Sequence, residues 1–193
     1  MNLSSLQNYT FETYKLVEFI CQMIKIIKAN VSHAETLSLI GRQTFLESHG
    51  ISASKTDIDT YINLKFTKTA FETELVDSNN IFHILLYDEK PIGYSKILYS
   101  ISQKNIPFKN VTKLERIYIL KAFHNLKLGK ELLNFNVSLS QKNTQSGMWL
   151  YVWTENHRAV NFYKKTGFEI VGSYDFKISE THSNPNHQML LTY

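Results

Sequence analysis

The sequence has little that would hold it together covalently or divide it into parts. It contains one cysteine, Cys21, so no disulfide can form within the chain, and nothing indicates an oxidising compartment. Proline occurs three times and glycine seven times. No stretch is rich in proline, glycine and serine, so we find no linker. A length of 193 residues fits one domain with a sizeable core.

Positive charge and apolar residues are present, but neither is concentrated. The formal net charge is +4, and no run of four or more Lys or Arg occurs. This excess favours anionic ligands, yet nucleic-acid binding requires a denser basic stripe. The apolar run at residues 16–27 is too short to span a bilayer and contains Glu18 and Lys25. The start of the chain also lacks the features of a signal peptide. We therefore expect a cytoplasmic protein with no nucleic-acid partner and no membrane contact.

Metal ligands are sparse as well. The seven histidines are dispersed along the chain. His182 and His187 lie five residues apart in a polar stretch, but no third ligand is evident near them. We predict no metal site.

Hydrophobic periodicity predicts the elements that are present. Residues 1–22 are expected to be an N-terminal extension with a helix, and residues 23–193 a single domain. Apolar runs predict about seven strands, at residues 23–29, 81–87, 92–100, 114–120, 148–153, 168–176 and 187–193. Apolar residues at helical spacing predict about four helices, at residues 32–49, 57–66, 128–141 and 158–165, with a further short one around 70–75.

Cap residues indicate where three of these helices begin. Ser32 precedes the first helix, and Glu35 follows three residues later, as in a capping box. Thr56 or Asp57 is expected to begin the second helix, and Asn156 the last.

The order of the elements predicts a mixed sheet. Strands 81–87 and 92–100 are separated by a short polar turn and should form a hairpin. The unit from residue 114 to 153 reads as strand, helix and strand, and its length suits a right-handed parallel crossover. The fold class is therefore α/β or α+β, with a mostly antiparallel sheet and one central parallel pair.

The turn inside that crossover has the position of a phosphate-binding loop. A strand, a tight turn and a helix N-terminus present free N–H groups and the helix dipole to an anion. Such turns are usually rich in glycine, whereas this one contains only Gly129. The turn by itself is either a phosphate site or a plain connection.

Two segments together resemble the GNAT (GCN5-related) N-acetyltransferase family. LERIYILKAFHNLKLGKELL, residues 114–133, is similar to its motif A, and LYVWTENHRAVNFYKKTGFEIVG, residues 150–172, is similar to its motif B. Their wording looks most like the bacterial PaiA-type spermidine/spermine acetyltransferases. The resemblance covers about residues 23–193. Motif A departs from the family pattern, because His124 and Lys127 replace its Gln/Arg and its first glycine.

This resemblance implies the reaction and the cosubstrate. The expected activity is transfer of acetyl from acetyl-CoA to a primary amine of a small molecule, favoured to be a polyamine, by direct attack in a ternary complex. Two rivals stay open: a protein or peptide N-acetyltransferase, and a non-catalytic module that binds acyl-CoA.

The resemblance also assigns cofactor-binding positions. Main-chain groups of the strand are expected to pair with the pantetheine amides, and backbone amides of the turn with the pyrophosphate. The predicted cofactor-binding residues are Ile117, Tyr118, Ile119, His124, Asn125, Leu126, Lys127, Leu128, Gly129, Lys130 and Asn156.

Two side chains are candidates for proton transfer. An amine with a pKa of about 10 is almost wholly charged at neutral pH, so a base must take its proton. Glu115 is the candidate base, and the alternative is an ion pair with Arg116 or a nearby lysine. The resemblance implies that Tyr163 is the acid for the leaving thiolate, and the alternative is a core tyrosine.

Two further features leave the acceptor and the assembly open. Acidic residues on the predicted helices could attract a polycation or be solvated surface groups: Glu47, Asp57 and Asp59. Aromatic residues of the closing strands could serve a homodimer or belong to the core: Tyr151, Trp153 and Tyr174.

Overall fold

The computed structural model describes residues 23–193, and the predicted N-terminal extension with its helix lies outside these residues. The strands are β1 (Ile24–Lys28), β2 (Ile81–Tyr87), β3 (Lys90–Leu98), β4 (Thr112–Ile119), β5 (Gly147–Trp153), β6 (Glu169–Lys177) and β7 (Ser183–Thr192). The α-helices are α2 (Ala34–His49), α3 (Lys55–Lys65), α4 (Lys68–Val76), α5 (Leu128–Lys142) and α6 (His157–Lys165). Two 3₁₀ helices are η1 (Val31–His33) and η2 (Lys121–Leu126).

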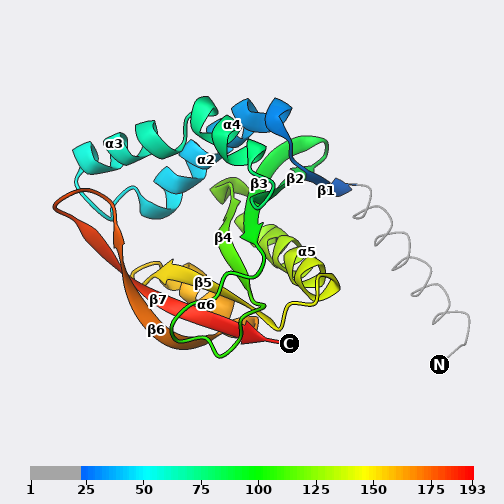
Figure 1. Ribbon diagram of the computed structural model, residues 1–193. Helices are drawn as coiled ribbons and strands as arrows, with labels where there is room; N and C mark the ends of the chain where they lie inside the picture. The colour runs from blue at the N-terminus through cyan, green and yellow to red at the C-terminus, as the bar shows by residue number, and fades with distance from the viewer. Residues whose placement is uncertain (1–22) are drawn as a thin grey trace, which may run out of the picture.

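The seven strands form one sheet in the order β1-β2-β3-β4-β5-β7-β6 (Figure 1). Every neighbouring pair is antiparallel except β4 and β5, which are parallel. The predicted mixed sheet, its hairpin and its central parallel crossover are therefore confirmed. The described part of the chain has five α-helices, and the further short helix predicted around residues 70–75 is α4.

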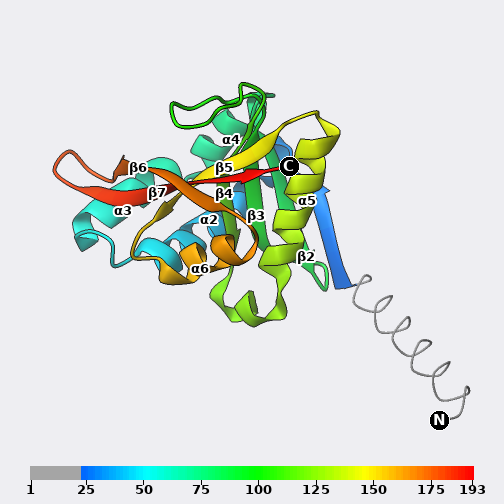
Figure 2. The same ribbon diagram turned by 90° about the horizontal axis from the view of Figure 1, so that it is seen from below.

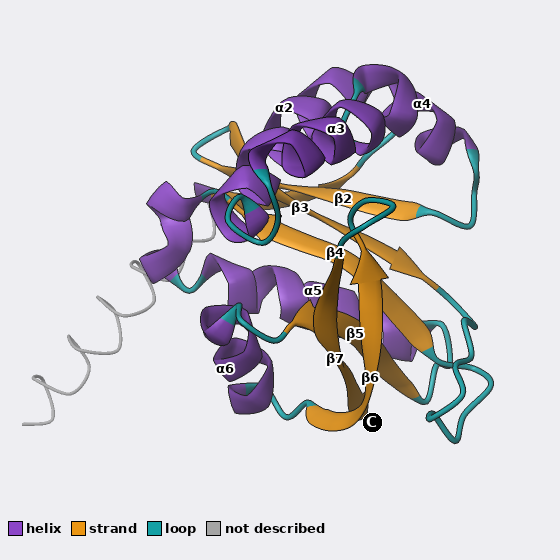
Figure 3. Ribbon diagram, turned by 90° about the vertical axis from the view of Figure 1, so that its left-hand side faces the viewer, coloured by secondary structure: helices purple, strands orange, loops and turns teal. Residues whose placement is uncertain are grey.

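Helices cover the sheet on both faces (Figures 2 and 3). On one face, α2, α3 and α4 pack on β2 and β3 through a core that includes Leu37, Ile58, Phe71, Phe82 and Tyr94. On the other face, α5 and α6 pack on β3, β4 and β5. That core is separate and includes Leu114, Leu133, Leu150, Val160 and Met189.

Two of the predicted helix caps are wrong. Asn30, not Ser32, caps the segment that leads into α2: its Oδ1 accepts from the Ser32 amide at 3.0 Å, and the His33 ring accepts from the Asn30 amide. A 3₁₀ turn thus precedes α2 and moves the cap towards the N-terminus. Ser54, not Thr56 or Asp57, caps α3, because its Oγ accepts from the Asp57 amide at 3.1 Å.

The last strand begins earlier than predicted. The polar residues Ser183–Asn186 already pair with β6, and Pro185 lies opposite Asp175. Proline is unusual inside a sheet, which is why the sequence indicates a later start. Pro185 is tolerated here because the pairing of β7 with β5 ends at Asn186.

The parallel strands β4 and β5 pair over a very short distance. Only Thr112 with Met148 and Lys113 with Trp149 are partners, and beyond them the two strands diverge. On its other edge β4 pairs with β3, but the register shifts so that Lys96 faces Arg116 and Ile97 faces Leu114. Glu115 is therefore the extra residue of a β-bulge, which bends β4 where it leaves β5.

A buried charge cluster fixes α4 to β3 and β4, next to the opening that forms where β4 and β5 diverge. Glu74 of α4 accepts from Lys96 Nζ of β3 at 2.7 Å and from Arg116 Nη2 of β4 at 2.9 Å. The side chains of Lys96 and Arg116 are only 8% and 14% exposed. Each cation is therefore stabilised largely by one shared carboxylate.

Replacing Glu74 by Gln should lower the free energy of unfolding by about 3 kcal/mol, because two buried cations would lose their counter-charge. Urea unfolding measures the change. The matched control is Glu72→Gln on the same helix, whose exposed pair with Lys68 spans 3.8 Å and should contribute less than about 0.5 kcal/mol. Equal effects of the two substitutions would contradict the role given to the cluster.

Candidate active site

The opening between β4 and β5 exposes backbone groups of β4. The Leu120 amide donates to the Ile92 carbonyl of β3 at 2.9 Å. Because the groups of successive residues alternate in direction along a strand, those of Ile119 and Ile117 point to the opposite edge, where β5 has diverged. These two residues therefore have the main-chain position predicted for pairing with an amide-bearing ligand.

Two of the predicted cofactor-binding residues have other partners within the protein. By the same alternation the main chain of Tyr118 faces its β3 partner, Tyr94, so its groups do not point into the opening. His124 Nε2 lies 2.9 Å from the Ile119 carbonyl and holds η2 against the end of β4. The predicted cofactor contact of Tyr118 through its backbone is thus not supported by this geometry.

In the glycine-poor turn before α5, a lysine adopts the left-handed backbone conformation. Lys127 has φ 59° and ψ 8° and directly precedes α5. This conformation is uncommon for any residue but glycine, Asn or Asp, and it costs about 1–2 kcal/mol. Lys127 therefore occupies the position of a glycine in conformation as well as in sequence.

The first turn of α5 leaves part of its amides free. The Lys130 amide already donates to the Lys127 carbonyl at 2.9 Å, so it is not a free donor for a pyrophosphate. Within residues 23–193, the amides of Leu128 and Gly129 have no backbone acceptor. A Cβ placed on Gly129 would meet no atom within 4 Å, so space is open beside these donors. Asn125 and Leu126 are exposed just before them. The turn has the donors and the room that an anion requires.

Helix α6 positions two predicted residues at the end of β5. Asn156 Oδ1 accepts from the Ala159 amide at 3.1 Å, which confirms the predicted cap. Tyr163 is buried, and its ring packs against Phe162 and Phe168. Burial, aided by the nearby Tyr118, raises the pKa of the Tyr163 phenol. It is a protonated phenol that can donate.

Glu115, the candidate base, forms an ion pair. Its carboxylate lies 2.7 Å from Lys113 Nζ, the nearby-lysine pairing that the sequence left open, whereas Arg116 binds Glu74. Burial raises the pKa of Glu115, but the charge and hydrogen bond of Lys113 outweigh it and hold that pKa below its usual value. This carboxylate must exchange its lysine partner for the amine before it could take a proton.

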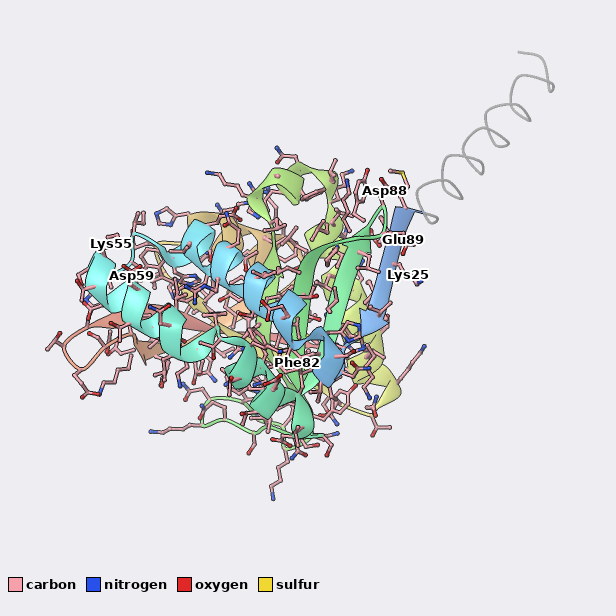
Figure 4. All side chains as sticks on the ribbon, turned by 90° about the horizontal axis from the view of Figure 1, so that it is seen from above. Lys25, Lys55, Asp59, Phe82, Asp88 and Glu89 are labelled. Atoms are coloured by element: carbon pink, nitrogen blue, oxygen red, sulfur yellow. The ribbon has the colours of Figure 1, made fainter. Side chains whose placement is uncertain are left out.

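The acidic residues proposed to attract a polycation all have local partners. Glu47 accepts from the Lys121 amide at 2.8 Å and from Gln43, so it ties α2 to η2. Asp57 bonds to the Ser54 hydroxyl. Asp59 is paired with Lys55 on the outer face of α3 (Figure 4).

An aromatic group that the sequence did not indicate closes over the opening. His49, the last residue of α2, stacks on Phe45 with ring centroids 4.9 Å apart and on Trp153 of β5 at 5.8 Å. Its ring also meets the edge of Tyr118 of β4 at 6.4 Å. His49 thus spans the two diverging strands. Only its place before Gly50, at the helix end, was visible in the sequence.

The described residues contain no cluster of three or more potential metal ligands. None of the helices in residues 23–193 combines the length and apolar character needed to cross a membrane.

A sheet whose two central parallel strands part beside a free helix N-terminus is the architecture of an acyl-CoA-dependent acetyltransferase. Residues 47–168, more than half of the chain, match the acetyltransferase (GNAT) family. The chain belongs to this family, and acetyl-CoA is its cosubstrate.

Individual relatives are distant. The chain is 26% identical over 157 residues, 81% of its length and 91% of the relative's, to an uncharacterized N-acetyltransferase of Lactobacillus delbrueckii subsp. lactis. It is 27% identical over 147 residues, 76% of its length and 89% of the relative's, to a spermidine N(1)-acetyltransferase of Thermoplasma acidophilum. The PaiA N-acetyltransferase of the same organism, solved with coenzyme A, superimposes with a TM-score of 0.71 at 24% identity, covering 88% of this chain and 99% of that one.

The backbone strain at Lys127 can be tested by replacing the lysine with glycine, which adopts positive φ freely. Lys127→Gly should raise the free energy of unfolding by up to about 1 kcal/mol, because glycine adopts positive φ freely but loses more entropy on folding. The control is Lys130→Gly inside α5, which should lower it by about 1 kcal/mol. Thermal or urea unfolding measures both. A destabilised Lys127→Gly variant would show that the lysine side chain, rather than the left-handed backbone, matters to stability.

Proposed function

We propose that this protein transfers an acetyl group from acetyl-CoA to a primary amine of a small molecule, by direct attack in a ternary complex. The main observation that supports this proposal is the opening between β4 and β5. The free amides of Leu128 and Gly129 follow β4 in the chain, and the Tyr163 phenol follows β5. Since the two strands are parallel, both sets of groups lie at the same end of the sheet.

Residues of the turn and of β4 could bind the two polar parts of acetyl-CoA, its pyrophosphate and its pantetheine arm. The amides of Leu128 and Gly129 would donate to the pyrophosphate, and the exposed ammonium of Lys127 adds positive charge beside them. The outward main-chain groups of Ile117 and the Ile119 amide would pair with the pantetheine amides in the manner of an added strand. His124 contributes indirectly, by fixing the end of β4.

The chemical step needs a neutral amine and a protonated leaving group. Tyr163 would donate its phenolic proton to the thiolate as the carbon–sulfur bond breaks. Its raised pKa keeps it protonated throughout the neutral range. Glu115 could accept the amine's proton only after its ion pair with Lys113 opens, so the base is the less well supported of the two roles.

Spermidine and spermine are the first acceptors to test. The support is the likeness to a spermidine acetyltransferase of Thermoplasma acidophilum. The engaged acids Glu47, Asp57 and Asp59 do not add to it. A peptide acceptor and a non-catalytic acyl-CoA-binding module are the rivals. Cytoplasmic location and a homodimer stay predictions from the sequence.

Incubation with acetyl-CoA and spermidine should release free CoA, measured with a thiol reagent. A panel of small amines, an N-terminal peptide and a lysine peptide would rank the acceptors. Calorimetry with CoA distinguishes the rivals: binding without turnover on any acceptor supports the module, and faster turnover of a peptide supports the protein acetyltransferase.

Replacing Tyr163 by Phe should lower kcat by about 100-fold, because the thiolate would lose its proton donor. Acetyl-CoA binding, measured by calorimetry, should stay within about twofold, since a phenyl ring keeps the packing. Tyr174→Phe, at a half-exposed ring on the edge strand β6, is the control and should change neither. An unaltered rate in Tyr163→Phe would remove this residue from the mechanism.

A further inference from the structure

The environment of His49 suggests a functional side chain rather than a purely structural one. Its ring lies between three aromatic side chains from three elements, Phe45 of α2, Tyr118 of β4 and Trp153 of β5. The residue is nevertheless partly exposed. It lies where β4 and β5 have separated, on the face of the sheet that α2 and α3 cover. An acceptor approaching the opening from this face would meet the imidazole.

Hydrogen bonding determines which nitrogen of His49 carries the proton. Ser48 Oγ lies 2.7 Å from the Thr44 carbonyl and 2.7 Å from His49 Nδ1. The hydroxyl has one proton, and a carbonyl can only accept, so that proton goes to Thr44. His49 Nδ1–H must then donate to Ser48 Oγ, which leaves Nε2 as the unprotonated nitrogen.

The free nitrogen is also reachable. Among the described residues Nε2 has no hydrogen-bond partner, yet it is not one of the buried unpaired atoms, unlike Nδ1 of His83. Burial lowers the pKa of His49 to about 4, so the ring stays neutral at physiological pH. Of the rings that contact it, only Tyr118 can ionise, and burial raises the pKa of that phenol. The carboxylate of the adjacent Glu47 is bonded to Gln43 and to the Lys121 amide.

We propose that His49 Nε2 accepts a hydrogen bond from the acceptor amine and takes its proton as the amine attacks the thioester. The aromatic surroundings favour the uncharged form of an amine bound beside the ring, by the same loss of solvation that lowers the pKa of His49. The amine's N–H becomes strongly acidic as the nitrogen bonds to the acetyl carbon, so the ring takes the proton during the attack and not before it. This inference rests on the proposed function for its reaction, but its geometry is independent of it.

The proton and electron balance is complete. The nitrogen lone pair forms the bond to the acetyl carbon, and the carbon–sulfur bond breaks with its electrons going to sulfur. The nitrogen's proton moves to His49 Nε2, and the Tyr163 proton moves to sulfur. The imidazolium then returns a proton to the phenolate through water, so the products are the amide and the free thiol.

The test compares two variants of His49 with a control. His49→Phe keeps the stacking but removes the acceptor nitrogen, and kcat/KM for the amine should fall about 100-fold. His49→Gln keeps an acceptor oxygen that cannot hold the proton, and it should lose less, about tenfold. Acetyl-CoA affinity should stay within twofold in both. His83→Phe, the same change at a buried histidine on β2, should leave all of these values unaltered.

Imidazole nitrogen NMR of the unmodified protein gives a readout that does not need turnover. The expected spectrum shows His49 neutral between pH 5.5 and 8, with its proton on Nδ1, and a shift of Nε2 when the amine is added. A proton on Nε2, titration near pH 6.5, or an unchanged kcat/KM in a folded His49→Phe variant would overturn the inference. Failure of the proposed function would instead appear as no turnover of any amine by the unmodified protein.

Discussion

The short pairing of β4 with β5 is the constraint on which the site depends. Each strand is held firmly on its outer side, β4 by β3 and β5 by β7 along its whole length. Because only two residue pairs join them, the strands part and leave main-chain groups of β4 without a strand partner. Unpaired backbone groups are costly unless water or a ligand satisfies them. A ligand with its own amides is therefore the natural occupant of this gap.

The bulge at Glu115 and the cluster around Glu74 maintain that divergence. The bulge inserts one extra residue into β4 and increases its local bend. On the same strand, Arg116 is bound to α4 through Glu74, so the bend is stabilised from the helical layer. Glu47 then joins the end of α2 to the first residue of η2. Residues far apart in sequence thus hold one opening in a fixed shape.

Most of the fold could be predicted from the sequence because it follows from local periodicity. Strand 148–153 is apolar on both faces and proves to be a central strand, and Asn156 caps α6 as predicted. The misses are of two kinds. Ser32 and Thr56 failed as caps because the helical turns begin earlier, at residues capped by Asn30 and Ser54.

The second kind of miss concerns contacts between distant segments. Lys113 and Glu115 lie on the same face of one strand, but periodicity does not reveal which of the nearby cations the carboxylate binds. The stacking of His49 on Trp153 joins residues of α2 and β5, and no local pattern in one sequence specifies it. The candidate site is therefore predictable in its backbone positions, and much less so in the side chains that would handle protons.

The turn before α5 shows why a missing glycine is weak evidence against phosphate binding. In such turns the donors are backbone amides, so what matters is the backbone conformation. Glycine reaches positive φ without strain, whereas Lys127 reaches it at a cost of about 1–2 kcal/mol. That cost is small beside the total stability of a domain, and the lysine adds a positive charge where an anion would bind. The departure from the family pattern at this residue thus changes the side chain of the turn while its backbone keeps the required form.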